Sequence, residues 1–184
     1  MKFEVSSGKI IISDPCYTAG SGGNIILENV KNGIWKASYS VLDCRIESLS
    51  AFCGEVRKFD CIWEELKEGI DVDSGQAGIF DLKKYRRDEF VDGKITFDRG
   101  VDEPGEKFYA KCCDVTLSKE QVGVVNGGAV SSSGYGDGSY RCFVLKDADD
   151  KIFGVKISFI DDEYENEEYD DDEYGEEDGE SDEE

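Results

Sequence analysis

The chain has 184 residues, of which 39% are hydrophobic, and its ten Phe and nine Tyr side chains are enough to build one folded core. Its formal net charge is −22, but the last 24 residues hold 17 of the 43 acidic residues and none of the 21 basic ones. The sequence contains no histidine, which excludes Ser-His and Cys-His nucleophile pairs, histidine general bases and the commonest metal ligand.

The predicted elements are mostly β-strands, because short apolar and β-branched runs alternate with Gly, Asn and Asp. In chain order these strands cover residues 9–12, 24–30, 34–42, 45–52, 108–117, 122–130, 140–146 and 152–160. Asn32-Gly33 predicts a hairpin between the second and third strands, and residues 147–151 predict a turn between the last two. Residues 61–67 and 82–90 carry short helical patterns, the second with Asp81 as its N-cap.

These elements predict a mainly β fold, with α+β as the alternative. We expect an antiparallel sandwich or a strongly bent sheet with one or two short helices. Residues 1–160 form the predicted globular domain. From Asp161 onward the apolar periodicity stops, and Asp, Glu, Gly and three spaced Tyr residues predict a disordered acidic tail over 161–184. We interpret the tail as a solubilising segment, with a decoy for nucleic acid as the alternative.

Deletion of residues 161–184 is expected to leave the melting temperature nearly unchanged. A segment without apolar periodicity adds nothing to a hydrophobic core. Thermal melts of the full chain and the truncated chain measure this directly, and a loss of several degrees would show that the tail stabilises the fold.

The rest of the chain predicts a cytoplasmic protein that does not bind membranes or nucleic acid directly. Without the tail, 26 acidic residues face 21 basic ones, a net charge of −5, and the only dense basic run lies at 83–87. Nucleic-acid binding needs clustered Lys and Arg. No run approaches ~18 uninterrupted apolar residues, and the N-terminus lacks the pattern of a signal peptide.

The seven cysteines are expected to be free thiols, because a cytoplasmic compartment is reducing and their number is odd. Their spacing contains no C-x2-C pair, so we expect no structural zinc, and no other cofactor is predicted. Residues 146–151 begin like a calcium loop, but Lys151 and Ile152 replace the oxygen ligand and the glycine that such a loop needs. We therefore predict a hairpin turn there and no metal.

The stretch "ISDPCYT", residues 12–18, ends an apolar strand at Asp14-Pro15, since proline has no N–H and stops strand pairing. Cys16 follows directly after this strand end. A thiol there becomes nucleophilic if its pKa is lowered, but no Lys or Arg lies nearby in the sequence. A buried, unreactive cysteine is the interpretation that we favour.

The stretch "VDSGQAGIFD", residues 72–81, contains Asp73-Ser74-Gly75, which matches the D-[ST]-G tripeptide of aspartic proteases. Those enzymes need two carboxylates that share a proton. The second candidate, in the order Asp137-Gly138-Ser139, does not match the tripeptide. We favour a turn that Asp73 and Ser74 close through hydrogen bonds to their own backbone.

The stretch "SGYGDGSY", residues 133–140, has glycines at 134, 136 and 138, which permit positive φ angles, so that the loop turns sharply into a strand near Tyr140. In this interpretation Asp137 accepts backbone N–H bonds inside the loop. In the alternative, Asp137 and Tyr140 form a small polar pocket with Asp73 and Gln76 at one end of the sheet. The candidate binding residues are Asp14, Cys16, Asp73, Ser74, Gln76, Asp81, Tyr135, Asp137 and Tyr140.

Together these motifs resemble the bacterial and phage proteins grouped as the domain of unknown function 4241 family. Asp14-Pro15 matches an early D-P after a strand, "VDSGQAGIFD" resembles a central block, and "GYGDGSY" matches a late G-x-G-D-G-x-Y. The similarity covers roughly residues 9 to 160. It implies a β-rich cytosolic protein and no particular reaction.

Three functions follow from these patterns. The leading one is a binding module, such as an inhibitor or an immunity-like protein, that acts on a macromolecular partner, most simply another protein. It is favoured by the lack of histidine, the acidity and the small β body. The second is a carboxylate-based hydrolase that uses Asp73 and Asp137. The third is an acidic mimic of nucleic acid. The patterns do not predict an oligomeric state.

Overall fold

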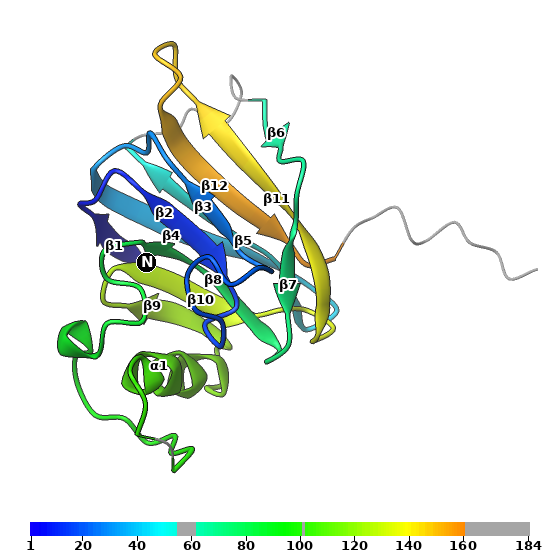
Figure 1. Cartoon of the computed structure of the whole chain (residues 1–184). Helices are drawn as coiled ribbons and strands as arrows, with labels where there is room; N and C mark the ends of the chain where they lie inside the picture. Colours follow the sequence, from blue (N-terminus) through cyan, green and yellow to red (C-terminus); the bar gives the residue numbers. More distant parts are fainter. Residues whose placement is uncertain (55–61, 101, 161–184) are drawn as a thin grey trace, which may run out of the picture.

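The computed structural model describes residues 1–54, 62–100 and 102–160, and this part of the chain is mainly β, as predicted. Its strands form two antiparallel sheets that pack face to face, with one α-helix against the outer face of the smaller sheet (Figure 1). The acidic segment 161–184 lies outside the described residues.

The larger sheet has seven strands in the order β1-β4-β5-β12-β11-β6, with β7 paired to another part of β11. The bounds of these strands are β1 Lys2–Val5, β4 Gly33–Leu42, β5 Arg45–Cys53, β12 Ile152–Ser158, β11 Gly138–Lys146, β6 Glu64–Glu65 and β7 Ile70–Val72. The smaller sheet has five strands in the order β3-β2-β8-β10-β9. Its strands are β3 Ile25–Leu27, β2 Ile10–Ser13, β8 Gln76–Asp81, β10 Gly128–Ser132 and β9 Val122–Val125.

The larger sheet buries one face only. Trp35 and Ala37 of β4 point into the core, whereas Ser38 and Ser40 point outward and bond to the facing serines of β5, Ser50 and Ser48. This alternation is typical of an antiparallel sheet with one solvated face. It confirms the strands predicted at 34–42 and 45–52.

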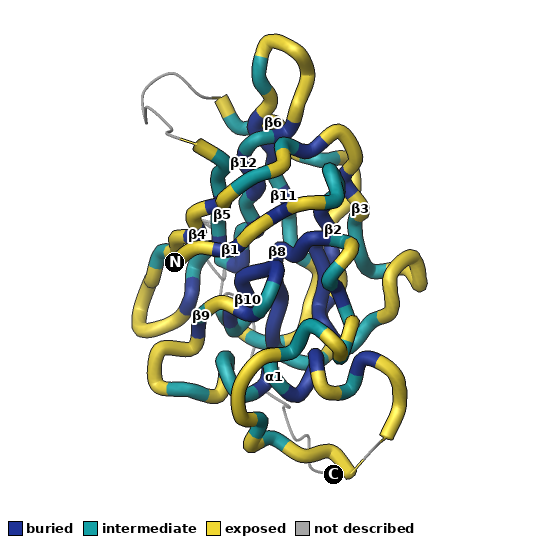
Figure 2. Tube along the Cα trace, turned by 90° about the vertical axis from the view of Figure 1, so that its left-hand side faces the viewer, coloured by how far each residue is buried: buried dark blue, intermediate teal, exposed yellow. Residues whose placement is uncertain are grey.

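The smaller sheet is covered on both faces, and Figure 2 shows β2, β8 and β10 as buried strands. Ile10 and Ile12 of β2 face the larger sheet, and Ile11 faces the other way, toward Phe80 and Phe108. A strand that is buried on both faces appears in the sequence as a continuous apolar run. The apolar run at residues 10–12 is therefore explained by the position of β2 in the smaller sheet, between the larger sheet and α1.

The predicted strand at 108–117 is wrong, because these residues belong to the helix α1, Glu106–Thr116. Phe108 and Cys112, four residues apart, lie on its buried face against the smaller sheet. The helix begins after Gly105, and the Asp88 carboxylate accepts the N–H groups of Gly105 and Phe108. A carboxylate from another segment thus satisfies two of the free donors at the start of the helix.

Two further strand predictions need correction. Residues 122–130 form not one strand but the hairpin β9–β10, which turns at Asn126 and Gly127. Asn32-Gly33 does not join a hairpin, since β3 belongs to the smaller sheet and β4 to the larger one. The chain changes sheets at this point, and the Asn32 side chain accepts the N–H of Gly8 instead.

The predicted helices at 61–67 and 82–90 are not formed as such. In the described part of the first segment, residues 64–65 make the short strand β6, and residue 61 lies outside the described residues. The second segment forms a turn that begins at Asp81, whose carboxylate accepts the N–H of Lys83 as an N-cap would. It then ends in the 3-10 helix η1, Asp88–Phe90.

The turn predicted at 147–151 is confirmed. The Asp147 carboxylate accepts the N–H groups of Asp149 and Lys151 and closes the connection between β11 and β12. Within the described residues, no helix is long and apolar enough to cross a membrane.

Candidate functional site

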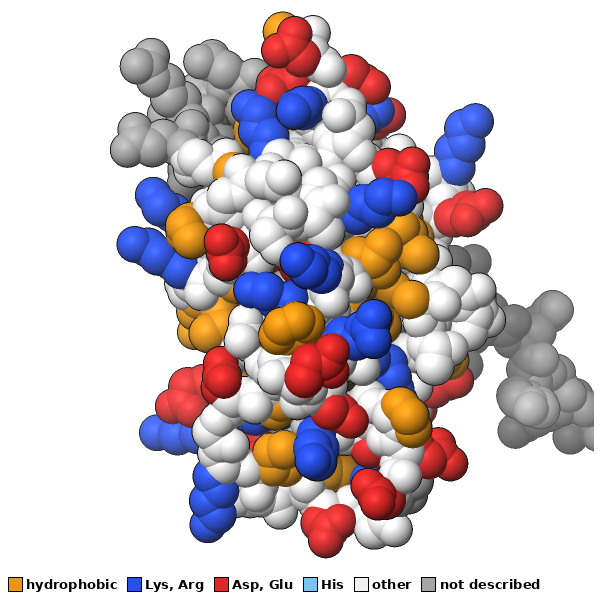
Figure 3. Space-filling model, turned by 60° about the vertical axis from the view of Figure 1, so that its left-hand side comes forward, with side chains coloured by type: hydrophobic (Ala, Val, Ile, Leu, Met, Phe, Trp, Pro, Cys, Tyr) orange, Lys and Arg blue, Asp and Glu red, His pale blue; other side chains and the backbone are white. Residues whose placement is uncertain are grey.

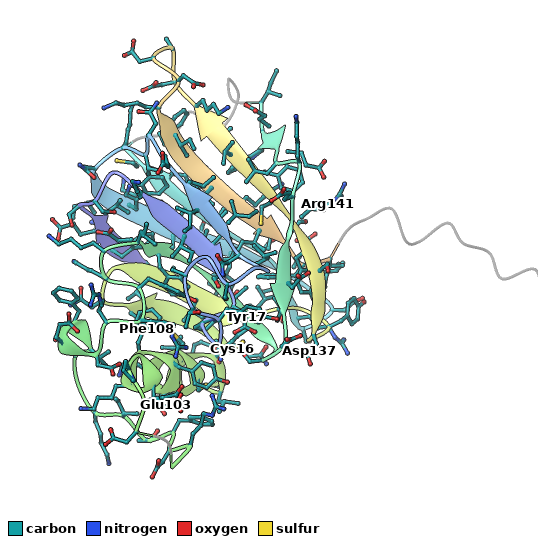
Figure 4. The ribbon with its side chains drawn as sticks, in the orientation of Figure 1. Cys16, Tyr17, Glu103, Phe108, Asp137 and Arg141 are labelled. Atoms are coloured by element: carbon teal, nitrogen blue, oxygen red, sulfur yellow. The ribbon has the colours of Figure 1, made fainter. Side chains whose placement is uncertain are left out.

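Most of the predicted site residues meet at one end of the two sheets, which we call the polar end. It consists of the loop after β2 (residues 14–24), the β7–β8 turn (residues 73–75) and the β10–β11 loop (residues 133–137). Figure 4 shows Cys16, Tyr17 and Asp137 at this end, on the side of the sheets nearest α1.

Asp14 is the centre of the polar end. Its carboxylate is fully buried and accepts four hydrogen bonds. Oδ1 accepts the N–H of Cys16 at 2.8 Å and the hydroxyl of Ser74 at 2.6 Å. Oδ2 accepts the N–H groups of Asp73 and Ser74 at 3.0 and 2.7 Å. Donors from two loops therefore surround the carboxylate, which joins those loops to each other.

The D-S-G turn is closed by Asp14 from another loop, and not by the side chains of Asp73 and Ser74 as the sequence predicted. Asp73 instead accepts a hydrogen bond from the hydroxyl of Tyr17 at 2.5 Å. Asp137 accepts the N–H of Gly75 at 3.0 Å, so its bond also reaches across to this turn. The two candidate hydrolytic carboxylates flank the same turn, and each is already hydrogen-bonded within the chain.

The glycine-rich loop has the predicted backbone conformation. Gly134, Gly136 and Gly138 have φ angles of 62°, 106° and 154°. The hydroxyl of Tyr140 lies 2.8 Å from the carbonyl oxygen of Ser133 and 2.7 Å from that of Gly136, and so holds the loop closed. A Cβ at Gly134 would lie 3.1 Å from the carbonyl oxygen of Ile46 and from Phe159 Cβ, so this position also packs tightly against β5 and the residue that follows β12. The glycines and Tyr140 therefore build a fixed turn.

Cys16 lies at the polar end and is half-buried, not fully buried as predicted. Burial and the neighbouring Asp14 carboxylate raise the pKa of the Cys16 thiol to about 12. At neutral pH the thiol therefore keeps its proton, whereas nucleophilic cysteines need a lowered pKa. The interpretation of Cys16 as a structural residue agrees with this environment.

Gln76 does not join a polar pocket with Asp137 and Tyr140. Its side chain is buried and points to α1, where Nε2 donates to the Cys113 sulfur at 3.2 Å and Oε1 accepts the Thr116 hydroxyl at 3.1 Å. Gln76 therefore fixes the helix to β8. Sequence reasoning missed this role because it placed a strand where α1 lies.

Asp81 lies apart from the other predicted residues, and Tyr135 belongs to the β10–β11 loop of the polar end but is exposed to solvent. Asp81 is at the opposite end of β8 from the D-S-G turn, fully buried, and accepts the N–H and hydroxyl of Ser6. Tyr135 is 71% exposed, and its ring centroid lies 4.9 Å from the guanidinium carbon of Arg45. Neither side chain bonds to the carboxylates at the polar end.

Arg86 is the main residue of this region that the sequence did not reveal. Its largely buried guanidinium donates to the carbonyl oxygens of Pro15 and Cys16 and lies 3.5 Å from the Glu106 carboxylate in the first turn of α1. It thus joins the loop after β2 to the helix. The basic run at 83–87 lies within the segment predicted as a short helix, and nothing in its pattern indicates a buried arginine.

The pockets described in the structure lie away from the polar end. One, of about 370 Å3, is lined by parts of β1, β9 and residues 84–92, and another, of about 430 Å3, lies beside the start of α1. Neither contains a predicted site residue. Among the described residues, no three Cys, Asp or Glu side chains come together in a way that could hold a metal ion.

No family model matches the chain, and no curated protein or solved structure matches it either. The resemblance to the domain of unknown function 4241 family stays a prediction that rests on the three motifs.

Substitutions of Asp137 show whether its hydrogen bond or its negative charge holds the loops together. Asp137→Ala is expected to lower the free energy of unfolding by about 1 kcal/mol, because the Gly75 N–H loses its acceptor. Asp137→Asn keeps a carbonyl oxygen as acceptor and should cost less than half as much. Denaturant unfolding of both variants measures the difference. Equal losses would mean that the negative charge, and not the hydrogen bond, holds the two loops together.

Cys142 makes the stability of the protein sensitive to high pH. Burial raises the pKa of its thiol from 9.0 to about 12. The unfolded chain therefore loses this proton near pH 9 while the folded chain keeps it. The resulting stability is complete below pH 9 and disappears as the pH rises toward 12.

We expect that Cys142→Ala flattens the fall of unfolding free energy over this interval by up to ~1.4 kcal/mol per pH unit, whatever its constant cost in packing. Urea unfolding at a series of pH values gives these slopes. Cys44→Ala, at an exposed cysteine, is the matched control and should follow the wild type. Parallel curves for wild type and Cys142→Ala would contradict the prediction.

Proposed function

We propose that this protein is a cytoplasmic, non-enzymatic interaction module that acts by binding a macromolecular partner, as an inhibitor or an immunity-like protein does. The proposal rests on the hydrogen bonding of the carboxylates at the polar end. Its carboxylates at Asp14, Asp73 and Asp137 already accept hydrogen bonds from Ser74, Tyr17 and Gly75, among others. Bonds of this kind connect the loops to one another and support a structural role for these carboxylates.

A general base needs an open acceptor within reach of the proton that it removes. Asp14 has no open side, since its two oxygens accept two bonds each and the side chain is buried. The Cys16 thiol, with its pKa raised to about 12, does not offer a nucleophile in its place. The buried centre of the polar end thus supports a structural scaffold, and the exposed carboxylates of Asp73 and Asp137 are the groups that the variants below test.

The charge of the body does not favour the alternative of a nucleic-acid mimic. Figure 3 shows Lys and Arg side chains interspersed with Asp and Glu on the face that it presents. Several surface carboxylates are paired with lysines, as Glu28 is with Lys9 and Asp147 with Lys31. A mimic of nucleic acid requires a continuous negative surface, because its partner binds phosphates through clustered cations.

Affinity capture with the full-length chain from the native host tests the proposal, followed by reconstitution from purified components. We expect a partner that binds at constant stoichiometry, keeps its mass after incubation, and binds Asp73→Asn and Asp137→Asn variants as it binds the wild type. A partner that the wild type cleaves and that an Asp73→Asn variant leaves intact would overturn the proposal in favour of the hydrolase.

A further inference from the structure

An open edge of each sheet lines the same pocket. β1 is the outermost strand of the larger sheet and β9 that of the smaller one, and Figure 1 shows the two close together at the left of the molecule. The pocket of about 370 Å3 lies at these edges, and α1 and residues 84–92 complete its walls. Unpaired strand edges are the surfaces on which an extended peptide can add as a further strand.

In β1, the backbone N–H and C=O groups of two residues point toward this open edge. Met1 and Ala37 exchange both backbone hydrogen bonds, at 3.0 and 2.9 Å. Bonded and non-bonded pairs alternate along an antiparallel ladder. The N–H and C=O groups of Lys2 and Glu4 therefore point away from β4, and both residues line the pocket. Among the described residues, no backbone group outside the sheet bonds to them.

The β9 edge faces the pocket in the same way. The N–H of Ser132 donates to the carbonyl oxygen of Gln121, which fixes the alternation along β9 and β10. The backbone of Val124 therefore points outward, and its side chain, which lines the pocket, is 39% exposed. Unpaired backbone groups thus face the pocket from both sheets.

The pocket combines an apolar floor with a partly basic rim. Phe3, Phe108 and Val125 are buried at its base. Three lysines and two carboxylates are the charged residues of its lining: Lys2, Lys84, Lys111, Glu4 and Asp92. Lys84 lies 3.5 Å from Glu4, and Lys111 donates to the carbonyl oxygen of Lys94. Within the described part of the chain, no ion pair is found for Lys2 or Lys111, and Lys2 is the one of the two for which no side-chain hydrogen bond is found either.

We propose that this pocket binds an extended segment of a partner protein, which adds as a strand to the edge of β1. Its backbone pairs with the outward groups of Lys2 and Glu4, an apolar side chain enters the pocket beside Val124, and an acidic side chain lies against Lys2. The outward backbone groups favour an extended peptide over a small molecule, because they offer donors and acceptors at the spacing of a strand. This inference rests on the proposed function and specifies where and how the partner binds.

Titration calorimetry with a short, end-capped peptide of alternating valine and glutamate tests the site. We expect the full-length wild type to bind it, and the same peptide with N-methyl groups along one edge not to bind. Glu4→Pro removes the outward N–H of Glu4 and leaves the bonds to β4 intact, so binding should weaken at least ~10-fold. Glu4→Ala, which keeps that N–H, is the matched control and should stay within ~3-fold of the wild type.

Lys2→Pro removes the other outward N–H close to the chain terminus, and it serves as the second variant if Glu4→Pro fails to fold by circular dichroism. Lys2→Gln should abolish the preference for glutamate over glutamine in the peptide. The inference is overturned if the wild type does not bind the peptide, or if the proline variants that fold bind it as Glu4→Ala does.

The same variants separate this inference from the proposed function. A captured partner that binds the wild type but not Glu4→Pro supports both. A partner that binds Glu4→Pro and the wild type equally leaves the interaction module in place and shows that its binding surface lies elsewhere.

Discussion

Asp14→Ala is expected to lower the free energy of unfolding by about 3 to 5 kcal/mol, among the largest losses for a single side chain in this protein. The substitution removes the acceptor of four hydrogen bonds and leaves the N–H groups of Cys16, Asp73 and Ser74 without a partner. Because Asp14 is fully buried, water does not replace the carboxylate without further opening of the loops. Urea unfolding followed by fluorescence measures the loss.

Asp98→Ala is the matched control, since the Asp98 carboxylate accepts the single N–H of Gly100 in an exposed turn. It should cost less than ~1 kcal/mol. Asp14→Asn should also destabilise the protein, because an amide NH2 would oppose donors from the D-S-G turn. A loss of less than ~1 kcal/mol for Asp14→Ala would contradict the view that this carboxylate holds the polar end together.

Arg86→Met should lower the free energy of unfolding by about 3 kcal/mol. The guanidinium donates to the carbonyl oxygens of Pro15 and Cys16, and its removal leaves these groups unpaired. Glu106, which is also largely buried, loses the nearer of its two cationic partners, while Arg99 stays at 3.6 Å. Breaking a buried ion pair from one side costs more than the pair itself contributes.

Chemical denaturation of Arg86→Met and Arg87→Met compares the unfolding free energies of two variants within the same basic run. Arg87 is exposed, so its substitution should change the free energy of unfolding by less than ~0.5 kcal/mol. A second substitution, Glu106→Gln, should recover part of the loss in the Arg86→Met background, because it removes a largely buried charge that has lost one of its two cationic partners. Indistinguishable stabilities of Arg86→Met and Arg87→Met would show that the guanidinium does not link the loop to α1.

Local sequence patterns were sufficient to predict the strands that have one solvated face. In β4 and β5 the alternation of apolar and polar residues reports the two faces directly, as with Trp35, Ser38 and Ala37. They were insufficient for residues 108–117, whose apolar and aromatic residues fit a strand or a helix. The spacing of Phe108 and Cys112 was available as a helical signal, but the cap from Asp88 is a tertiary contact that the local sequence does not contain.

The structure brings together those candidate residues whose motifs follow strands that end at the same edge. Asp14, Asp73 and Asp137 follow β2, β7 and β10, and the structure brings their loops together. Asp81 belongs to the same sequence motif as Asp73, but it lies at the far end of β8, because that strand runs away from the D-S-G turn. Gln76 could be placed only once α1 was known, since its partners lie on that helix.

The central claim is that the protein acts by binding, with the carboxylates of the polar end as structural groups. The most direct test compares the wild type with an Asp73→Asn/Asp137→Asn double variant against the purified captured partner, with affinity and partner mass measured in the same samples. The account predicts affinities within ~3-fold of each other and an unchanged partner mass in both. Cleavage of the partner by the wild type, and its absence with the double variant, would contradict the account and identify the two carboxylates as catalytic.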